Sequence, residues 1–324
     1  MRRAGEMESH SVLITSVSAK VPMVTAVSTA LSKLASNGRV FGADTNEACL
    51  GRHFVDGFWT MPRDDQLLVD DVVTWCRAND VRVVFPSRDG ELPFWAAHRD
   101  VLHDNGISVM VSDADTVNVC LDKLAFYRKC ETLGYPAIFT SEDCNRTAGE
   151  LLVVKERFGA RADNIGIGLT NDQAMRHAKS LTAPVFQPFV SGDEISADLY
   201  VSLGSDVKGV VLRRRNMVVN GESQVTTTFR DESLESLCAE MARGLKLRGH
   251  AMLQIIIDET SKPHVIECNC RFGGASTLGV EAGLDSFYWF VLESMGSELS
   301  DKAVALADMP LRQIRYAADK VVPA

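Results

Sequence analysis

The segment Glu267-Cys-Asn-Cys-Arg-Phe-Gly-Gly274 combines a carboxylate, an amide and a guanidinium in a short run that ends in two glycines. It continues an apolar stretch, and we predict a β-strand over residues 264–271. Glu267, Asn269 and Arg271 are spaced by two residues, so their side chains project from the same face of that strand. This strand face is therefore the first candidate for a functional site.

The run before this strand, residues 251–258, is a second apolar strand with a polar residue, Gln254, in its interior. A carboxylate and an amide that face a buried glutamine on the next strand are costly to bury without a counter-ion. All-oxygen ligation suits Mg²⁺, with Mn²⁺ as the alternative ion, and Mg²⁺ commonly bridges nucleotide phosphates. The competing interpretation is a buried hydrogen-bond network that holds no metal.

The first third of the chain alternates apolar strand runs with helical patterns. Because strand–helix–strand units pair their strands in parallel, we predict a parallel sheet in this region. Ligands of such sheets gather at the carboxyl ends of the strands, where the polar loop 86–92 follows one of them. The loop is either a substrate wall or a solvated turn with a helix N-cap. Because this region contains no GxGxxG motif, we expect no dinucleotide cofactor. We predict strands at 11–15, 39–44, 81–85 and 107–111, and helices at 23–37, 65–79 and 98–105.

The middle of the chain places a lysine at the end of an apolar strand and follows it with a glycine-punctuated polar loop. Lys155 ends the run 151–155 and either meets an anion or reaches the surface as a snorkelling side chain. In the loop 156–168, glycines allow backbone N–H groups to approach phosphate oxygens, although surface hairpins have the same composition. We predict helices at 123–133 and 234–247, and strands at 184–190, 195–203, 209–215 and 225–229.

Charge and cysteine usage restrict the class of protein. The 324 residues include 34 Lys and Arg against 43 Asp and Glu, and the net charge of −9 argues against nonspecific binding to nucleic acid or anionic membranes. No run approaches the ~18 apolar residues of a membrane span. The eight cysteines form no CxxC pair, so we expect reduced thiols and a cytoplasmic enzyme rather than disulfides or a zinc site. Cys268 and Cys270 fall on the strand face opposite Glu267, where we expect packing thiols.

The order of these segments resembles the ATP-grasp superfamily, most closely one half of the carbamoyl-phosphate synthase large subunit. The resemblance covers nearly the whole chain, and its most specific piece is Glu267–Gly274, which is similar to the family's E-x-N-P-R-x-G-G segment. Cys270 replaces the usual proline, a change that leaves the side-chain directions of the strand unaltered. Further matches are Gln254, Leu121-Asp-Lys123 at a helix start, Lys155 and Gln187-Pro-Phe-Val-Ser-Gly-Asp-Glu194.

The resemblance implies an α/β and α+β architecture, with a Rossmann-like pre-ATP-grasp domain at residues 1–115 followed by a two-lobed ATP-grasp domain at 116–305. The lid lobe would span about residues 141–186, and residues 306–324 would form a C-terminal closing segment. The loop 157–168 would close over the triphosphate. That loop is poorer in glycine than in most members, with Ala160, Arg161 and Ala162 at its centre, which puts the usual lid geometry in question.

The resemblance also implies a role for each matching residue. Lys123 and Lys155 would contact the nucleotide phosphates, with Lys155 near the adenine as well. Gln187 and Phe189 would meet the adenine through backbone groups, and Glu194 would hold the ribose. Gln254, Glu267 and Asn269 would ligate Mg²⁺. Arg271 would stabilise the transferring phosphoryl group. Arg213 or Arg215 would reach into the same site, although the resemblance places these two residues less securely.

The implied activity is an ATP-dependent ligase that joins a small-molecule carboxylate to an amine or a thiol. ATP would phosphorylate the carboxylate, and the nucleophile would then displace phosphate from the acyl phosphate. One alternative is a split subunit that phosphorylates bicarbonate or carbamate together with a partner protein. Another is a nucleotide-binding module without turnover. A homodimer is common among relatives and is our expectation for the assembly.

Overall fold

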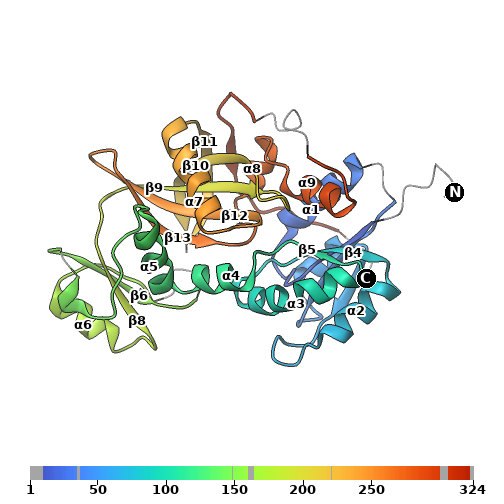
Figure 1. Ribbon diagram of the computed structural model, residues 1–324, viewed down its shortest axis with the longest axis horizontal. Helices are drawn as coiled ribbons and strands as arrows, with labels where there is room; N and C mark the ends of the chain where they lie inside the picture. The colour runs from blue at the N-terminus through green and yellow to red at the C-terminus, as the bar shows by residue number, and fades with distance from the viewer. Residues whose placement is uncertain are drawn as a thin grey trace.

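The computed structural model describes residues 10–34, 37–147, 149–159, 164–219, 221–299 and 306–321. The strands in these ranges form a five-stranded, a six-stranded and a three-stranded sheet. In Figure 1 the six-stranded sheet lies at the upper centre, the five-stranded sheet with its helices at the right and the three-stranded sheet at the lower left. A parallel α/β region followed by antiparallel sheets confirms the predicted fold class.

The five-stranded sheet is parallel throughout and has the order β3-β2-β1-β4-β5, as predicted for the first third of the chain. Its central strand β1 is buried along its whole length, as expected for a sheet with helices on both faces. The elements of this region are β1 (Ser11–Ile14), α1 (Val21–Lys33), β2 (Val40–Asp44), β3 (Gly57–Thr60), α2 (Val69–Ala78), β4 (Val81–Phe85), α3 (Leu92–Asp104), β5 (Ser108–Val109) and the 3₁₀ helices η1 (Leu50–Phe54) and η2 (Asp89–Glu91).

Some boundaries in this region differ from the sequence prediction. α2 begins at Val69 rather than at residue 65, because the backbone N–H groups of Gln66 and Leu67 both donate to the Arg63 carbonyl and close a turn there. α3 begins at Leu92, directly after the polar loop, rather than at residue 98. β3 was not predicted, since a four-residue strand at a sheet edge carries little periodicity.

The six-stranded sheet is antiparallel and has the order β13-β12-β9-β10-β11-β14. Residues alternate along β12: Leu253 and Ile255 are buried in the core, whereas Gln254 between them is only partly buried. α7 packs against β9 and β10. The elements of this region are β9 (Gly192–Val201), β10 (Val207–Val219), β11 (Glu222–Phe229), α7 (Glu232–Gly244), β12 (Gly249–Asp258), β13 (Pro263–Asn269), α8 (Thr277–Glu281), α9 (Ser286–Ser294) and β14 (Arg312–Ile314).

The three-stranded sheet is antiparallel, with β6 between β7 and β8, and it overlaps the predicted lid lobe, with β8 ending two residues beyond it. α6 packs on it, and a separate cluster of buried residues joins the helix to the sheet. β7 and α6 were not predicted, because the polar run around them is typical of a loop. The elements are the 3₁₀ helix η3 (Cys144–Arg146), β6 (Leu152–Glu156), β7 (Gly166–Leu169), α6 (Asn171–Ala178) and β8 (Pro184–Pro188).

Two consecutive helices, α4 (Ala114–Leu121) and α5 (Lys123–Leu133), connect the first sheet to the rest of the molecule. Asp122 separates them with an extended backbone, and its side chain accepts hydrogen bonds from the N–H groups of Leu124 and Ala125. This carboxylate is therefore the N-cap of α5, and Gly134 ends the helix with φ 75°. The capping geometry places Lys123 at the first position of α5.

The first sheet and the six-stranded sheet pack together through continuous apolar cores. One buried cluster includes Val84 of β4, Val117 of α4 and Leu253 of β12. A second runs from β4 to α9, where the rings of Phe85 and Phe287 meet edge to face with centroids 5.0 Å apart. Within the described ranges, no helix is both long enough and apolar enough to cross a membrane.

Candidate active site

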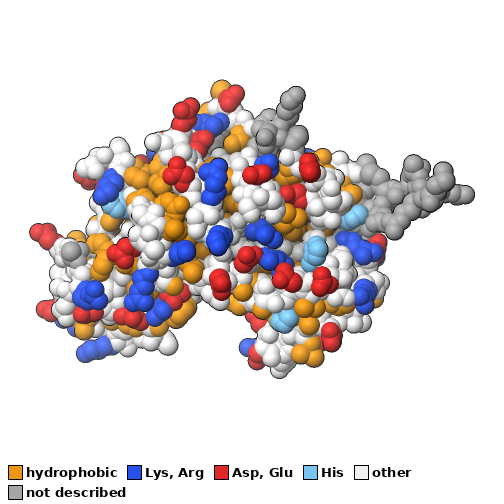
Figure 2. Space-filling view, viewed as in Figure 1, with side chains coloured by type: hydrophobic (Ala, Val, Ile, Leu, Met, Phe, Trp, Pro, Cys, Tyr) orange, Lys and Arg blue, Asp and Glu red, His pale blue; other side chains and the backbone are white. Residues whose placement is uncertain are grey.

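One large cleft collects the side chains that the sequence analysis selected. It encloses about 2850 Å³, more than the roughly 300–1,000 Å³ of an ordinary small-molecule pocket, so that a nucleotide and a second substrate can share it. Figure 2 shows the molecule notched between the lobe that carries β6 and β8 and the first sheet. The predicted site residues in the lining are Lys123, Lys155, Gln187, Phe189, Glu194, Gln254, Glu267, Asn269 and Arg271.

β12 and β13 present the predicted metal ligands side by side. Gln254 and Glu267 are directly opposite in the strand register, and the Asn269 side-chain amide donates to the Glu267 carboxylate over 3.2 Å. All three are partly buried on the cleft side, whereas Cys268 between the last two is buried on the other side, as predicted. A carboxylate flanked by amide oxygens is a donor set that fits Mg²⁺.

Lys155 lies at the end of β6 with only 8% of its surface exposed. Burial lowers the pKa of this amine to about 8, and the negative charge of Glu267 opposes that shift while Lys123 adds to it. Because this side chain is buried and lines the cleft, the snorkelling interpretation is wrong. Lys123 donates from its Nζ to the Gly159 carbonyl at 2.9 Å, and its backbone N–H donates to the Arg157 carbonyl at 3.2 Å.

The end of β8, which is predicted to meet an adenine base, already forms hydrogen bonds within the protein. The Gln187 side chain is buried and donates to the Thr140 hydroxyl at 2.8 Å. The Phe189 N–H donates to the Leu151 carbonyl at 2.9 Å. An adenine contact through this N–H therefore requires that bond to break, whereas the half-exposed Phe189 ring is already available to a flat ligand in the cleft.

The two arginines proposed as less certain contributors are both held by acids. Arg215 is ion-paired with Glu194 and donates to the Ser223 hydroxyl at 3.0 Å. Arg213 is buried and donates from two nitrogens to the carboxylate of Asp198, at 2.6 and 3.0 Å. Burial alone would raise the pKa of Asp198, but the charge and hydrogen bonds of Arg213, with help from His250, hold it well below its usual range.

The same buried carboxylate fixes the glycine turn after β13. The Ser276 hydroxyl donates to Asp198 Oδ1 at 2.6 Å and accepts from the Gly273 N–H at 3.0 Å. Glycines such as Gly273 and Gly274 allow a ligand to approach backbone N–H groups closely. The Gly273 N–H is instead bound inside the protein, and this network gives the turn a fixed shape.

Arg271 joins the six-stranded sheet to the polar loop of the first sheet. Its Nη2 donates to Asp89 Oδ2 at 2.5 Å, so the loop faces the glycine segment across the cleft. Glu91 shapes the loop, because its buried carboxylate accepts from the backbone N–H groups of Ser87 and Arg88, each at 2.9 Å. The pKa of Glu91 is raised by burial, although these hydrogen bonds oppose the shift. The loop is therefore built as a wall of the cleft and is not a solvated turn.

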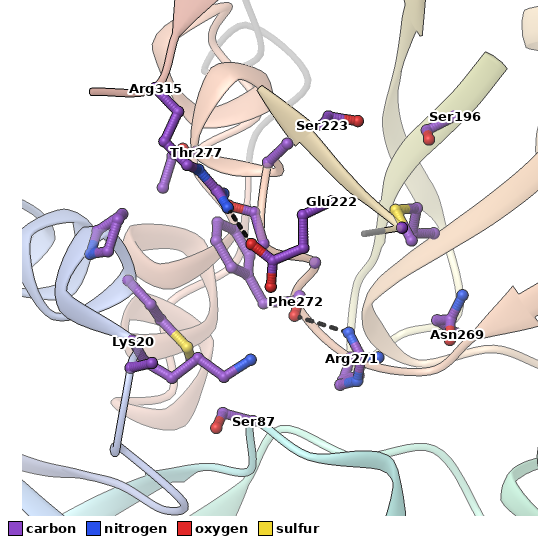
Figure 3. A pocket seen from close by; sticks show the side chains of 18 of the residues that line it. Lys20, Ser87, Ser196, Glu222, Ser223, Asn269, Arg271, Phe272, Thr277 and Arg315 are labelled. Atoms are coloured by element: carbon purple, nitrogen blue, oxygen red, sulfur yellow. Dashed lines mark hydrogen bonds and ion pairs between the residues drawn. The ribbon is translucent and has the colours of Figure 1, made fainter. Parts of the chain in front are cut away.

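The C-terminal strand adds residues that the sequence analysis did not select. Arg315, just after β14, donates to the Glu222 carboxylate at 2.6 Å and to the Gly274 carbonyl at 2.7 Å. Figure 3 shows this pair above Arg271 and Phe272, with Lys20, just before α1, and Ser87, just after β4, on the other side of the pocket. No local motif marks Arg315 or Lys20, and only their position in the fold brings them to the cleft.

Comparisons with known proteins agree with this arrangement. The family model of an ATP-grasp domain matches residues 120–275, and that of a PylC-like N-terminal domain matches residues 12–110. A comparison with curated proteins gave no significant match.

Several solved structures share the fold at low sequence identity. A Campylobacter jejuni biotin carboxylase superposes with a TM-score of 0.72 at 13% identity, over 92% of this chain and 74% of its own. An N5-carboxyaminoimidazole synthetase from Staphylococcus aureus gives a TM-score of 0.69 at 12% identity, over 92% and 80%. The biotin carboxylase domain of Hydrogenobacter thermophilus 2-oxoglutarate carboxylase gives 0.71 at 13% identity, over 93% and 73%. These structures share the fold, and the two family models confirm the predicted superfamily: the chain belongs to the ATP-grasp ligases, with a PylC-like domain in front of the ATP-grasp domain.

Proposed function

We propose that the protein uses ATP to phosphorylate a small-molecule carboxylate and then joins the acyl group to an amine or a thiol, with release of ADP and phosphate. The observation that carries this proposal is the convergence of Glu267, Asn269 and Gln254, the buried Lys155 and the cross-cleft Arg271 in one cleft. The solved relatives support it, because the Campylobacter jejuni enzyme was solved as a complex with β,γ-ATP and the Hydrogenobacter thermophilus domain as a complex with ADP and magnesium.

Gln254, Glu267 and Asn269 are the residues that would hold Mg²⁺. The ion would neutralise charge on the transferring phosphoryl group. The chain's own contribution is to hold the three side chains in register on adjacent strands, so that the donors need no rearrangement when the nucleotide arrives.

Lys155 and Lys123 would bind the phosphates from the opposite side of the cleft. A lysine buried to this degree is poorly hydrated, so its attraction to a phosphate is stronger than that of a surface lysine. Gln187 and Phe189 would line the adenine end, and Glu194 would face the ribose. The ion pair of Glu194 with Arg215 holds that carboxylate in place.

Arg271 and the loop 87–91 would hold the carboxylate substrate. A substrate oxygen attacks the γ-phosphorus, the bond from that phosphorus to the bridging oxygen of ADP breaks, and an acyl phosphate forms. The amine then attacks the acyl carbon, the bond to the phosphate oxygen breaks, and the amine loses a proton. Arg271, which lines the cleft, would stabilise the charge on the phosphoryl oxygens in both steps.

Bicarbonate is the second candidate for the phosphorylated group. The Hydrogenobacter thermophilus structure contains a bicarbonate anion together with ADP, and two other relatives are named as a biotin carboxylase and a carboxyaminoimidazole synthetase. This candidate corresponds to the expected alternative of a subunit that phosphorylates bicarbonate or carbamate with a partner. The same Hydrogenobacter thermophilus domain was solved as a dimer, which supports our proposal of a homodimer for this chain.

The test is a screen for ADP release in which carboxylates are crossed with amines and thiols, with bicarbonate as one of the acids. We expect one acid–nucleophile pair to give ADP and phosphate in equal amounts, and Glu267→Gln to lower the rate of ADP release by roughly 10²–10³-fold. ADP formation that needs bicarbonate and no other acid would select the second candidate. If nucleotide binds but no pair yields ADP, the protein is a nucleotide-binding module and the proposal fails.

A further inference from the structure

The face of β13 that points away from the cleft carries a cluster of three thiols. Cys268 and Cys270 come from this strand and its continuation, and Cys120 comes from the last turn of α4. Their sulfur atoms all lie within 4.8 Å of one another, and the residues are only 7%, 3% and 2% exposed for Cys120, Cys268 and Cys270. Packing thiols were expected here, but their convergence on one point was not.

The arrangement suits chelation better than disulfide formation. Cys268 and Cys270 are separated by one residue, so they project from the same strand face as parallel donors. Their Cα atoms are about 6.6 Å apart by strand geometry, close to the upper limit of about 6.8 Å for a disulfide. A disulfide from Cys120 to either one would leave the third thiol unused, whereas a single metal ion uses all three.

The spacing of the sulfur atoms is also close to that of a metal–thiolate site. Three sulfurs at ~2.3 Å from a central ion in one plane lie ~4 Å apart, so the thiols need to approach one another by less than ~1 Å. Among the residues that the structure describes, no His, Asp or Glu joins the cluster. The donor set is thus sulfur only, which selects soft cations over Mg²⁺.

We propose that Cys120, Cys268 and Cys270 form a second metal site, separate from the catalytic one, for a single thiophilic cation, Cu⁺ or Zn²⁺. Binding forms three metal–sulfur bonds and releases the three thiol protons to solvent. Cu⁺ accepts soft thiolate ligation of this kind, and Zn²⁺ would need a fourth ligand to complete its tetrahedron. Because Asn269 lies between two of the thiols on the same strand, the ion would brace the strand that presents the catalytic residues.

The test is an anaerobic titration of the reduced full-length chain with Cu⁺ and, separately, with Zn²⁺, each in competition with a chelator. We expect one equivalent of one ion to be retained, with a shell of sulfur atoms at about 2.3 Å in X-ray absorption. Cys120→Ser and Cys120→Ala should lose that equivalent. Cys238→Ser is the matched control, since Cys238 is equally buried in the same core but lies outside the cluster, and it should keep the ion.

Three results would overturn the proposal: no retained ion, retention that survives both Cys120 substitutions, or a bound ion with an oxygen shell. An oxygen shell would arise if Zn²⁺ bound instead beside Glu267 on the cleft face of β13. That ion would be lost in Glu267→Gln rather than in Cys120→Ser. The absorption spectrum of the unmutated protein decides between a sulfur and an oxygen shell even where a Cys120 variant fails to fold. Retention of the ion also raises the melting temperature, because the ligand binds the folded state, and this shift should disappear in Cys120→Ala.

Discussion

The six-stranded and the three-stranded sheets both supply side chains to the cleft, but they rest on very different amounts of buried apolar surface. In β9, every residue from Ile195 to Val201 is buried, and the core behind the six-stranded sheet continues into the first sheet. The described core of the three-stranded sheet consists of five buried residues, Cys144, Leu152, Val154, Ala174 and Phe186. Local stability follows buried contacts, so we infer that the large sheet is a rigid platform and the small sheet a lid that moves.

The sharpest test of the platform removes the charge of its central carboxylate. Glu267→Gln keeps the size of the side chain but weakens the proposed metal site, and we expect kcat to fall by roughly 10²–10³-fold, the usual effect of losing one preorganised electrostatic group. The melting temperature should change little. Glu259→Gln, an exposed carboxylate in the turn after β12, is the control, and equal activity in both variants would remove Glu267 from the mechanism.

The next largest effect concerns Arg271, which belongs to the platform but contacts the first sheet. Arg271→Ala should lower kcat about 100-fold and leave nucleotide affinity nearly unchanged. It should also destabilise the fold, because it leaves Asp89, its ion-pair partner, as a poorly exposed charge without compensation.

A double variant separates these two effects. Asp89→Asn added to Arg271→Ala should restore much of the melting temperature without restoring kcat. Recovery of activity along with stability would make Arg271 a structural residue only.

The lid contributes a pH dependence that the platform does not. The pKa of Lys155 is lowered to about 8 by burial, so the amine loses its charge as the pH rises through that value. Nucleotide affinity should be constant below pH 8 and fall about tenfold per unit above it. Lys155→Met should bind nucleotide weakly at every pH, and a wild-type affinity that stays flat up to pH 10 would contradict this assignment.

The lowered pKa of Lys155 also affects stability. A rise in pH through this range lowers nucleotide affinity, whereas its effect through Lys155 on the free energy of unfolding is an increase. The folded pKa lies below the ordinary value of 10.5, so between these two values the unfolded chain binds more protons than the folded one. The contribution of Lys155 to the free energy of unfolding of the nucleotide-free protein should therefore rise as the pH increases from about 8 to about 10.5, and the difference between the wild type and Lys155→Met measures it.

The smallest expected effect is a change in amide hydrogen exchange, and its measurement compares the mobility of the two sheets directly. Amide hydrogen exchange in β6 and in the loop 157–168 should slow several-fold when an ATP analogue and Mg²⁺ are added, whereas β12 should exchange slowly throughout. Residues 160–163 of this loop lie outside the described ranges, so their role in covering the phosphates stays a prediction. Unchanged exchange in the small sheet at saturating nucleotide would end the lid interpretation.

Local sequence pattern was enough to predict four of the five strands of the first sheet and the shared face of Glu267 and Asn269. Apolar runs mark buried strands, and a spacing of two residues sets which side chains share a face. α4 was missed because its sequence runs directly into α5, and only the extended backbone at Asp122 separates the two helices. The cysteine cluster was missed for the same reason, since Cys120 lies on that helix.

Contacts between distant parts of the chain could not be predicted. Arg315 pairs with Glu222, and Arg271 pairs with Asp89, across 93 and 182 residues, and no local pattern encodes such partners. The engaged N–H groups of Phe189 and Gly273 likewise depend on where Leu151 and Ser276 fold back. The domain boundaries at 115 and 305 and the role of each site residue remain predictions.

The central claim is that ATP phosphorylates the carboxylate directly, and oxygen transfer measures it most directly. Once the screen has identified the acid, that acid is labelled with ¹⁸O in its carboxylate and turned over with ATP and the nucleophile, and the phosphate is analysed by mass. The acyl-phosphate route predicts one ¹⁸O atom in each phosphate released. Phosphate without label, formed in step with ADP, would show that water receives the phosphoryl group and would contradict the proposed ligase mechanism.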